Sequence, residues 1–313
     1  MTANAKTLVV THLSALEHDT GPYHPESPDR LRSVLKALEQ SDFKDTAREN
    51  APEATLEQIA RAHPGEFGAR LTKAMPASGL KHLDPDTVVS PGSGEAMLRA
   101  AGAVVRAVDA VAKGEARNAF SAMRPPGHHA ESNRAMGFCL VNNAAVGAYH
   151  ARAAHGFKRV AVVDFDVHHG NGTQEIFWDD AEAFYASTHQ YPYYPGTGGR
   201  AEKGAHGNVV NVPLAAGSRG DVFRAGLRDE ILPALTAFKP DFLIISAGFD
   251  AHKDDPLAQL GLTETDFAWA TAALMDVAKT ACAGRVVSVL EGGYNLDALA
   301  DSVTAHVQTL KDH

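Results

Sequence analysis

Short apolar runs alternate with longer amphipathic or alanine-rich segments along the whole chain. The apolar runs have strand length and are rich in β-branched residues, which predicts strands at 7–11, 118–123, 158–165, 183–188, 208–212, 241–247 and 285–290. The longer segments predict helices at 27–40, 53–62, 94–113, 140–155, 219–238, 263–282 and 296–310. Three of these helices carry start signals: Ser27 before Pro28, Ser93 before an apolar run, and Thr263 followed by Asp266.

This alternation is typical of an α/β fold with a central, mostly parallel sheet and helices on both faces. The sequence has no linker, low-complexity tract or internal repeat, so we expect residues 1–313 to form a single domain. The apolar content of 44% and the charged content of 21% fit a globular protein with a sizeable core.

Composition narrows the range of partners and compartments. The net charge of −9 argues against general binding to nucleic acid. Cys139 and Cys282 are the only cysteines, too few for a disulfide framework or a thiolate zinc site. No apolar run approaches the ~20 residues of a membrane span, and the start of the chain lacks the pattern of a signal peptide. We therefore expect a cytoplasmic protein with no membrane or nucleic-acid partner.

Five loops rich in glycine, proline and polar residues follow predicted strands. They are RPPGHH (124–129), HHGNGT (168–173), YPYYPGTGG (191–199), AGFDAH (247–252) and EGGYN (291–295). Open α/β sheets bind their ligands beyond the carboxyl ends of the strands. The five loops therefore predict one active site at that edge of the sheet.

A metal site is predicted at the end of the run 158–165. Asp164, Asp166 and His168 occur at intervals of two, and residues two apart in a strand point to the same side. Asp166 and His168 together with Asp250 would supply two carboxylates and one imidazole and leave a coordination position open, as in catalytic zinc sites. The same ligands suit Fe(II), Co(II) or Mn(II), so the site is better defined than the metal.

The tandem pair His128-His129 indicates acid–base chemistry beside the metal, because adjacent residues of one loop rarely bind the same ion. Asp164 could orient one of these rings and Asn171 the other, each through the far ring nitrogen. Tyr294, which follows two glycines, could donate its hydroxyl to a developing oxyanion.

These residues together resemble the histone deacetylase superfamily on the arginase–deacetylase fold, and most closely its class II and bacterial deacetylase-like amidohydrolase branch. The matching segments occur in the family's order: HPESPDRL (24–31), RPPGHHA (124–130), GFCLVNNAA (137–145), VDFDVHHGNGT (163–173), YPGTG (194–198), SAGFDAH (246–252), DPL (255–257) and EGGYN (291–295). The resemblance implies a single catalytic domain that removes acetyl or other acyl groups from acetyl-lysine or related acylated amines with zinc-activated water. Relatives often pair or form tetramers, so the resemblance is compatible with a homo-oligomer, but the oligomeric state stays open.

Roles follow from the resemblance position by position. The zinc ligands are Asp166, His168 and Asp250; the acid–base and carbonyl-polarising groups are His128, His129, Asp164, Asn171 and Tyr294. The walls of the acyl-lysine channel are Gly137, Phe138, Tyr194 and Leu257. A structural monovalent cation, usually potassium, would be held by Asp164, Ser187 and the carbonyls of Asp166, His168 and Thr188, and a second by carbonyls near Phe177, Asp180, Ala183 and Asn208.

Three positions depart from common family patterns. Asn171 stands where class I members have an aspartate, and its uncharged amide would raise the proton affinity of His129 less than a carboxylate would. Tyr194 replaces a phenylalanine and adds a hydroxyl to the channel wall. Leu257 stands where polyamine-selective relatives have a glutamate, which argues against strict polyamine specificity.

Alternative functions remain open from the sequence. The substrate could be a small amide or an acetylpolyamine instead of protein lysine. A dimanganese ureohydrolase of the arginase type is disfavoured because Gly170 and His252 stand where that family has bridging aspartates. An inactive module that only binds acylated lysine is disfavoured because every ligand, both histidines and Tyr294 are present. Acyl-chain preference and the metal used in the cell stay undetermined.

Overall fold

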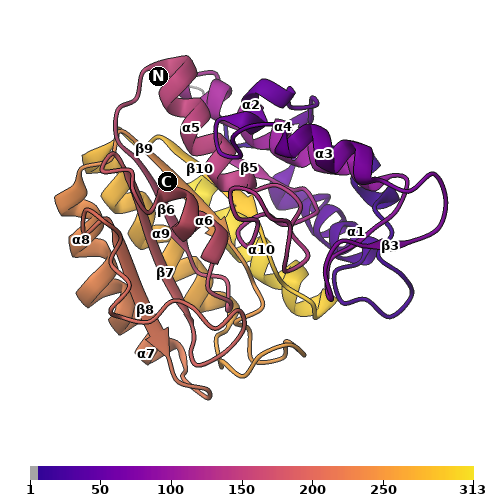
Figure 1. Ribbon diagram of the computed structural model, residues 1–313. Helices are drawn as coiled ribbons and strands as arrows, with labels where there is room; N and C mark the ends of the chain where they lie inside the picture. Colours follow the sequence, from indigo (N-terminus) through magenta and orange to yellow (C-terminus); the bar gives the residue numbers. More distant parts are fainter. Residues whose placement is uncertain (1–5) are drawn as a thin grey trace.

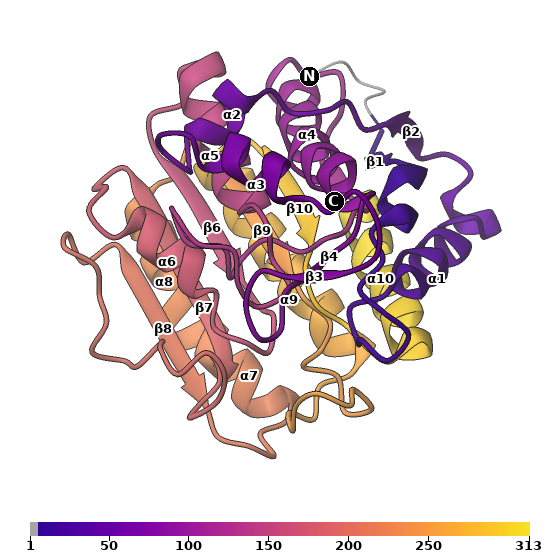
Figure 2. The same ribbon diagram turned by 45° about the vertical axis from the view of Figure 1, so that its right-hand side comes forward.

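The computed structural model describes residues 6–313, which form an eight-stranded sheet in the order β2-β1-β5-β10-β9-β6-β7-β8 (Figure 1). All seven pairings in this sheet are parallel. Figure 2 shows its two edges, with β1 and β2 at one side and β8 at the other. The strands are β1 (Leu8–Thr11), β2 (Ala47–Asn50), β5 (Ala119–Ser121), β6 (Val160–Asp164), β7 (Ala183–Gln190), β8 (Val209–Leu214), β9 (Phe242–Ala247) and β10 (Val286–Leu290); β3 (Lys81–His82) and β4 (Val88–Val89) form a separate antiparallel pair.

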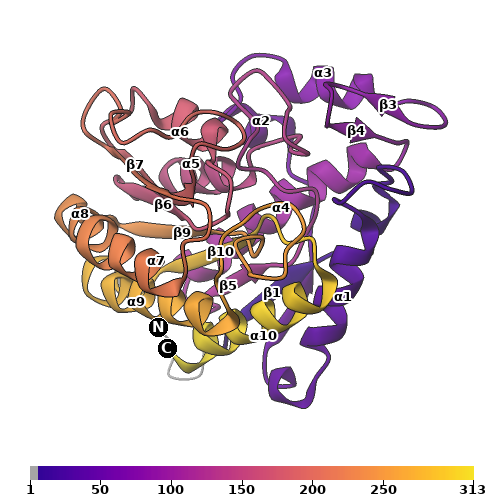
Figure 3. The same ribbon diagram turned by 90° about the horizontal axis from the view of Figure 1, so that it is seen from below.

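Helices cover both faces of the sheet, as Figure 3 shows. One face is covered by α4 (Ser93–Ala112) and α5 (Asn143–His155), the other by α7 (Gly220–Gly226), α8 (Leu232–Phe238), α9 (Glu264–Ala281) and α10 (Leu296–Asp312). The remaining helices are α1 (Pro28–Leu38), which packs on α10, the short α2 (Leu56–Ala60), α3 (Phe67–Ala74) and α6 (Asn171–Phe177), and the 3₁₀ turns η1 (Leu13–Glu17) and η2 (Ser41–Phe43). The predicted α/β fold is thereby confirmed, with a sheet that is wholly parallel.

The central strands are buried along their whole length because both faces of the sheet are covered. Successive residues of β9 illustrate the two-sided core. Ile244 packs into the cluster that includes Val104 of α4, while Ile245 packs into the cluster that includes Phe267 of α9. The continuous apolar runs in the sequence therefore mark strands covered from both sides.

All seven predicted strands are present, and the elements missed by the sequence patterns are short or half-exposed. The edge strand β2 has the sequence AREN, with alternating intermediate and exposed side chains. The strands β3 and β4 have two residues each, and α3 and α6 have eight and seven. Such segments bury too little apolar surface to produce a recognisable period.

The predicted helix 219–238 is divided into three parts. A π-helical turn, Leu227–Ile231 (η3), separates α7 from α8. Pro233 lies in the first turn of α8 and has no N–H to donate to a carbonyl one turn earlier. The interruption of the regular hydrogen-bond ladder therefore lies just before this proline, which cannot continue the ladder.

Of the helix start signals, the one at Thr263 is confirmed: the Asp266 carboxylate accepts a hydrogen bond of 2.9 Å from the Thr263 N–H. Pro28 is the first residue of α1, as predicted. Ser93, however, is already the first residue of α4, and Gly92 takes the cap position. The helix predicted at 140–155 starts at Asn143, three residues later than predicted. The Asn142 side chain caps this helix by accepting a hydrogen bond of 3.0 Å from the Ala145 N–H.

The order of the strands assembles the five polar loops. The neighbouring strands β5, β10, β9, β6 and β7 all end at the same edge because they are parallel. Their following loops carry, in that order, His128-His129, Tyr294, Asp250, the pair Asp166 and His168, and Tyr194. Within residues 6–313, no helix combines the length and apolar composition needed to cross a bilayer.

The buried His306 makes stability depend on pH. It lies in α10, and its two ring nitrogens contact the hydroxyls of Thr271 (2.6 Å) and Ser288 (2.8 Å). Burial lowers the pKa of His306 to about 3, from an ordinary value of 6.5. Between these two values the unfolded chain binds the proton and the folded chain does not, so the free energy of unfolding falls as the pH falls.

We predict that His306→Gln, which keeps polar contacts but does not titrate, flattens this dependence. Between pH 6 and 4.5 the free energy of unfolding of the wild type should fall more steeply than that of the variant, by about 1.4 kcal/mol per pH unit. Urea denaturation at several pH values measures both slopes. Equal slopes would show that His306 is charged in the folded protein.

Candidate active site

The three predicted metal ligands converge at the carboxyl ends of β6 and β9. His168 Nδ1 lies 3.1 Å from Asp166 Oδ1 and 3.1 Å from Asp250 Oδ2. All three residues are buried, and one ligand atom from each lies within 4.8 Å of the others. Two ligands bound to one tetrahedral ion at 2.0–2.2 Å lie roughly 3.3 Å apart. The spacing and the donor set of two carboxylates and one imidazole therefore fit a catalytic divalent metal.

Backbone N–H groups hold the far oxygens of these carboxylates. Gly292 donates to Asp166 Oδ2 and Val167 donates to Asp250 Oδ1, both at 2.8 Å. This leaves Asp166 Oδ1 and Asp250 Oδ2 directed at His168. Gly292 is required at its position because a Cβ there would collide with the Asp250 carboxylate.

A second group of possible ligands, Asp109, His150 and His155, lies between α4 and α5. Both histidine Nε2 atoms contact the same Asp109 oxygen, at 2.8 and 2.6 Å. These lengths are those of direct hydrogen bonds and fall further below the roughly 3.3 Å between two ligands of one tetrahedral ion than the 3.1 Å in the Asp166, His168 and Asp250 cluster. Arg61 also donates to His150 Nδ1, so the group reads as a network joining two helices.

The tandem histidines lie side by side, with ring centroids 4.0 Å apart, and each is held through its Nδ1. His128 Nδ1 lies 2.9 Å from Asp164 Oδ2, and His129 Nδ1 lies 2.8 Å from Asn171 Oδ1. The predicted pairing of Asp164 with one histidine and Asn171 with the other is the arrangement in the structure.

The two histidines have opposite proton affinities. Burial alone would lower the pKa of His128, but the carboxylates of Asp166 and Asp164 outweigh it and raise the pKa to about 10. Burial, together with the charges of His128 and His168, holds the pKa of His129 well below its usual value. These opposite shifts make His128 the more basic and His129 the less basic imidazole of the pair.

Tyr294 lies on the far side of the ligand cluster and is fixed at its backbone and its ring. Its N–H donates to Asp255 Oδ2 at 2.7 Å, and the Arg30 guanidinium lies 4.9 Å from the ring centre. Desolvation raises the pKa of the Tyr294 hydroxyl well above its usual value, so it remains a donor. Asp255 is a positioning residue that the sequence patterns missed.

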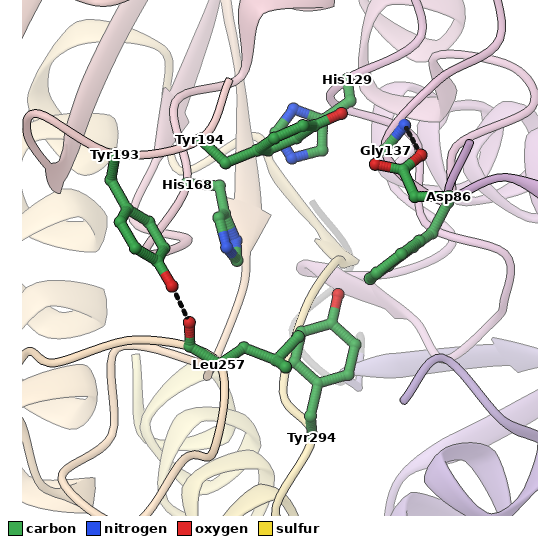
Figure 4. A pocket seen from close by; sticks show the side chains of 9 residues that line it. Asp86, His129, Gly137, His168, Tyr193, Tyr194, Leu257 and Tyr294 are labelled. Atoms are coloured by element: carbon green, nitrogen blue, oxygen red, sulfur yellow. Dashed lines mark hydrogen bonds between the residues drawn. The ribbon is translucent and has the colours of Figure 1, made fainter. Parts of the chain in front are cut away.

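A cavity of about 200 Å³ leads to this cluster (Figure 4). The four predicted channel residues all line it: Gly137, Phe138, Tyr194 and Leu257. So do three predicted residues of the site, His129, His168 and Tyr294. Asp86 and Tyr193 also line it and were not predicted. Asp86 accepts from the Gly137 N–H at 3.1 Å, and the Tyr193 hydroxyl donates to the Leu257 carbonyl. Gly137 has a φ of 59°, and a Cβ there would press on the His129 ring.

A buried ionic group missed by the sequence patterns links the first loops of the chain to the site. Arg124 binds both carboxylate oxygens of Glu26, at 2.8 and 2.6 Å, and Arg30 contacts the same carboxylate at 3.0 Å. Arg30 also donates to the carbonyls of Gly293 (2.6 Å) and Glu291. All three charged side chains are fully buried. Such residues give a weak sequence signal, namely charge beside proline at a strand end.

Glu291 is a second supporting residue that was not predicted. Its carboxylate is fully buried and accepts from the N–H groups of Gly127 (2.6 Å) and His128 (3.1 Å) and from the Ser246 hydroxyl (3.1 Å). Burial raises the pKa of Glu291 to about 7. The side chain thereby joins the loop after β10 to the loop that carries both histidines.

The two groups predicted to bind monovalent cations differ in structure. In the first, Asp164 is fully buried, and its Oδ2 also accepts from the Tyr185 hydroxyl at 3.2 Å. In the second, the carbonyls of Phe177, Asp180 and Ala183 converge on the side-chain amide of Asn208. The second group lies at the end of α6 and the start of β7, away from the channel lining.

Comparison with known proteins agrees with this geometry. Residues 24–310 match the histone deacetylase domain. The chain is 41% identical to a histone deacetylase-like amidohydrolase of Pseudomonas aeruginosa, over 87% of this chain and 73% of that protein. It is 38% identical to a probable deacetylase of Archaeoglobus fulgidus, over 93% of this chain and 82% of that protein. A crystal structure of the HDA15 HD domain superposes with a TM-score of 0.93 at 37% identity, covering 99% of this chain and 89% of that one. The chain belongs to the histone deacetylase family.

Proposed function

We propose that this hydrolase of amide bonds removes acyl groups from acetyl-lysine or a related acylated amine, with zinc held by Asp166, His168 and Asp250. The observation that carries the proposal is the convergence of these three buried ligands beside an oriented histidine pair at a cavity of about 200 Å³. A zinc ion, when bound, supplies a Lewis acid that lowers the pKa of an attacking water and polarises an amide carbonyl.

The hydrogen bonds of Asn171 determine how His129 can act. The Asn171 side-chain N–H₂ donates to Glu131 Oε1 at 2.9 Å, which turns its oxygen toward His129 Nδ1. The proton of neutral His129 is therefore on Nδ1, and the lone pair of Nε2 is free. A ring in this state can take a proton from water and return it to the leaving amine.

His128 has a different hydrogen-bonding partner and a different role. The Asp164 carboxylate can only accept, so His128 Nδ1 carries a proton. This ring stabilises negative charge that develops beside it. Tyr294 donates a hydrogen bond from its hydroxyl to the carbonyl oxygen of the substrate amide as that oxygen becomes negative.

The channel favours a linear acylated side chain. Phe138 and Tyr194 line it together with Leu257, which offers no charge to a distal ammonium group. Leu257 thereby argues against strict polyamine specificity, while the Asp86 carboxylate in the same lining offers an acceptor to an amide N–H or an ammonium group of a substrate. The arginase-type alternative fits poorly for two reasons. His252 Nε2 is hydrogen-bonded to Glu264 Oε1 at 3.0 Å. Gly170 has no side chain that could bridge to a second ion.

We predict hydrolysis of acetyl-lysine peptides by the purified protein, with one divalent metal per chain. Metal analysis should be combined with kinetics on acetyl-lysine peptides, acetylpolyamines and simple amides. A chelator should abolish turnover, because the ligands alone cannot activate water, and zinc should restore it. No turnover on any substrate by the fully metal-loaded protein would contradict the proposal, and two ions per chain with urea release would favour the arginase type.

Tyr294→Phe should lower kcat by about 10²–10³-fold, the usual effect of removing one oxyanion donor. The phenyl ring keeps the contact with Arg30, so the metal content and the melting temperature should stay near those of the wild type. Steady-state kinetics on an acetyl-lysine peptide measure the effect. Near-wild-type turnover would exclude the role given to the hydroxyl.

Glu291→Ala should lower kcat by about 10²-fold, because the loop that carries both histidines loses the acceptor of two N–H groups and can shift. KM and metal content should change little. Glu291→Gln is the matched control: its amide oxygen can accept both N–H groups while its N–H₂ donates to Ser246. We expect this variant to retain most of the turnover, and a loss as large as that of Glu291→Ala would show that charge, not position, matters.

A further inference from the structure

Three backbone carbonyls from one short segment point at a single side-chain atom. Asn208 Nδ2 lies 2.9 Å from the Phe177 oxygen, 3.2 Å from the Asp180 oxygen and 2.8 Å from the Ala183 oxygen. The segment runs from the last residue of α6 to the first residue of β7, and Asn208 directly precedes β8. Three convergent carbonyl oxygens are the kind of cage that holds a cation in proteins.

The orientation of the Asn208 amide follows from its surroundings. Its Oδ1 accepts from the His206 N–H at 3.3 Å, on the side away from the three carbonyls. The opposite orientation would place an oxygen against three oxygens with no hydrogen between them. The residue is buried, so water could not compensate for such a contact. The N–H₂ group must therefore face the carbonyls.

Two of the three carbonyls also accept hydrogen bonds from backbone N–H groups. The Phe177 oxygen accepts from the Asp180 N–H at 3.1 Å, and the Asp180 oxygen accepts from the Ala183 N–H at 3.0 Å. Each of these oxygens therefore has two donors, one from the backbone and one from Asn208. The Phe177 and Asp180 oxygens therefore have no acceptor capacity left for a cation unless the amide moves away.

The group around Asp164 provides a contrast within the same molecule. Among residues 6–313, no N–H or O–H group donates to the carbonyls of Asp166 and His168. That group also contains a buried carboxylate, which compensates positive charge, and the hydroxyl of Ser187. Free carbonyls with a carboxylate fit a monovalent cation, whereas the carbonyls around Asn208 do not.

We infer that the side-chain amide of Asn208 takes the place of a second monovalent cation in this chain. Its two N–H hydrogens provide the positive charge density that three carbonyls at a helix end require. Hydrogen bonds from one side chain thereby link α6, β7 and the start of β8, and this link needs no bound cation. Of the two groups predicted to bind a monovalent cation, the one around Asp164 then remains as the candidate site.

Anomalous diffraction tests this inference directly. Crystals of the wild type and of Asn208→Ala are grown or soaked in rubidium chloride, since rubidium replaces potassium and scatters anomalously. We expect no anomalous peak between the carbonyls of Phe177, Asp180 and Ala183 in the wild type, and a peak there in the variant. A peak at this position in the wild type would overturn the inference, as would a variant whose opened cage binds no rubidium.

Thermal unfolding gives an independent measurement in solution. Melting temperatures are compared in potassium chloride and in tetramethylammonium chloride of equal ionic strength, because the large organic cation cannot enter the cage. Potassium should stabilise Asn208→Ala more than it stabilises the wild type, by about 1.5 °C if the regained contacts contribute ~1 kcal/mol. An equal effect of potassium on both proteins would count against the inference.

Asn118→Ala is the matched control for the loss of a buried amide. Asn118 is also buried and donates to one backbone carbonyl, that of Leu310, at 2.7 Å. Its removal should lower the melting temperature equally in both salts, because a single carbonyl forms no cage. If Asn208→Ala folds only in potassium, that result supports the inference. If the variant does not fold at all, the diffraction test on the wild type remains decisive.

Discussion

Four carboxylates lie fully or almost fully buried at one edge of the sheet, and the site depends on how they are satisfied. Asp164, Asp166, Asp250 and Glu291 each accept at least one backbone N–H or side-chain donor from a neighbouring loop. An unpaired buried carboxylate is unfavourable by several kcal/mol, so the loops must keep the positions in which these donors point inward. The same contacts that compensate the charges therefore also fix the geometry of the ligands and the histidines.

The sheet order makes this concentration of charge possible. Five neighbouring parallel strands end at one place, so the groups of the site are shared among their loops and no single loop carries the whole site. Helix dipoles play a small part here, since α6, which begins with Asn171, is short. The positioning comes mainly from direct hydrogen bonds between loops, and these bonds connect residues far apart in the sequence.

This difference between local and distant contacts explains what the sequence could predict. The strands were predictable because double burial leaves uninterrupted apolar runs, and Asp166 and His168 were predictable because their spacing of two follows from strand geometry. The pairing of His129 with Asn171 followed from the types of residue available near the site. The contacts of Glu26 with Arg124, of Glu291 with His128 and of Asp255 with Tyr294 were not predictable, because each joins loops whose separation depends on the packed fold. The break in the helix at Pro233 and the convergence of three carbonyls on Asn208 likewise depend on backbone detail that residue patterns do not specify.

The four residues from Glu291 to Tyr294 each make a different long-range connection. The Glu291 carboxylate holds the histidine loop, the Gly292 N–H holds Asp166, the Gly293 carbonyl accepts from Arg30, and Tyr294 faces the channel. An insertion or deletion of one residue would misalign all four connections together, so this loop has almost no freedom to diverge in length. The loops after β7 and β9 are more exposed in part and supply Tyr193, Tyr194 and Leu257 to the channel wall. Descendants of this protein could therefore acquire new substrates by changing those two loops, while the loop after β10 would be inherited unaltered.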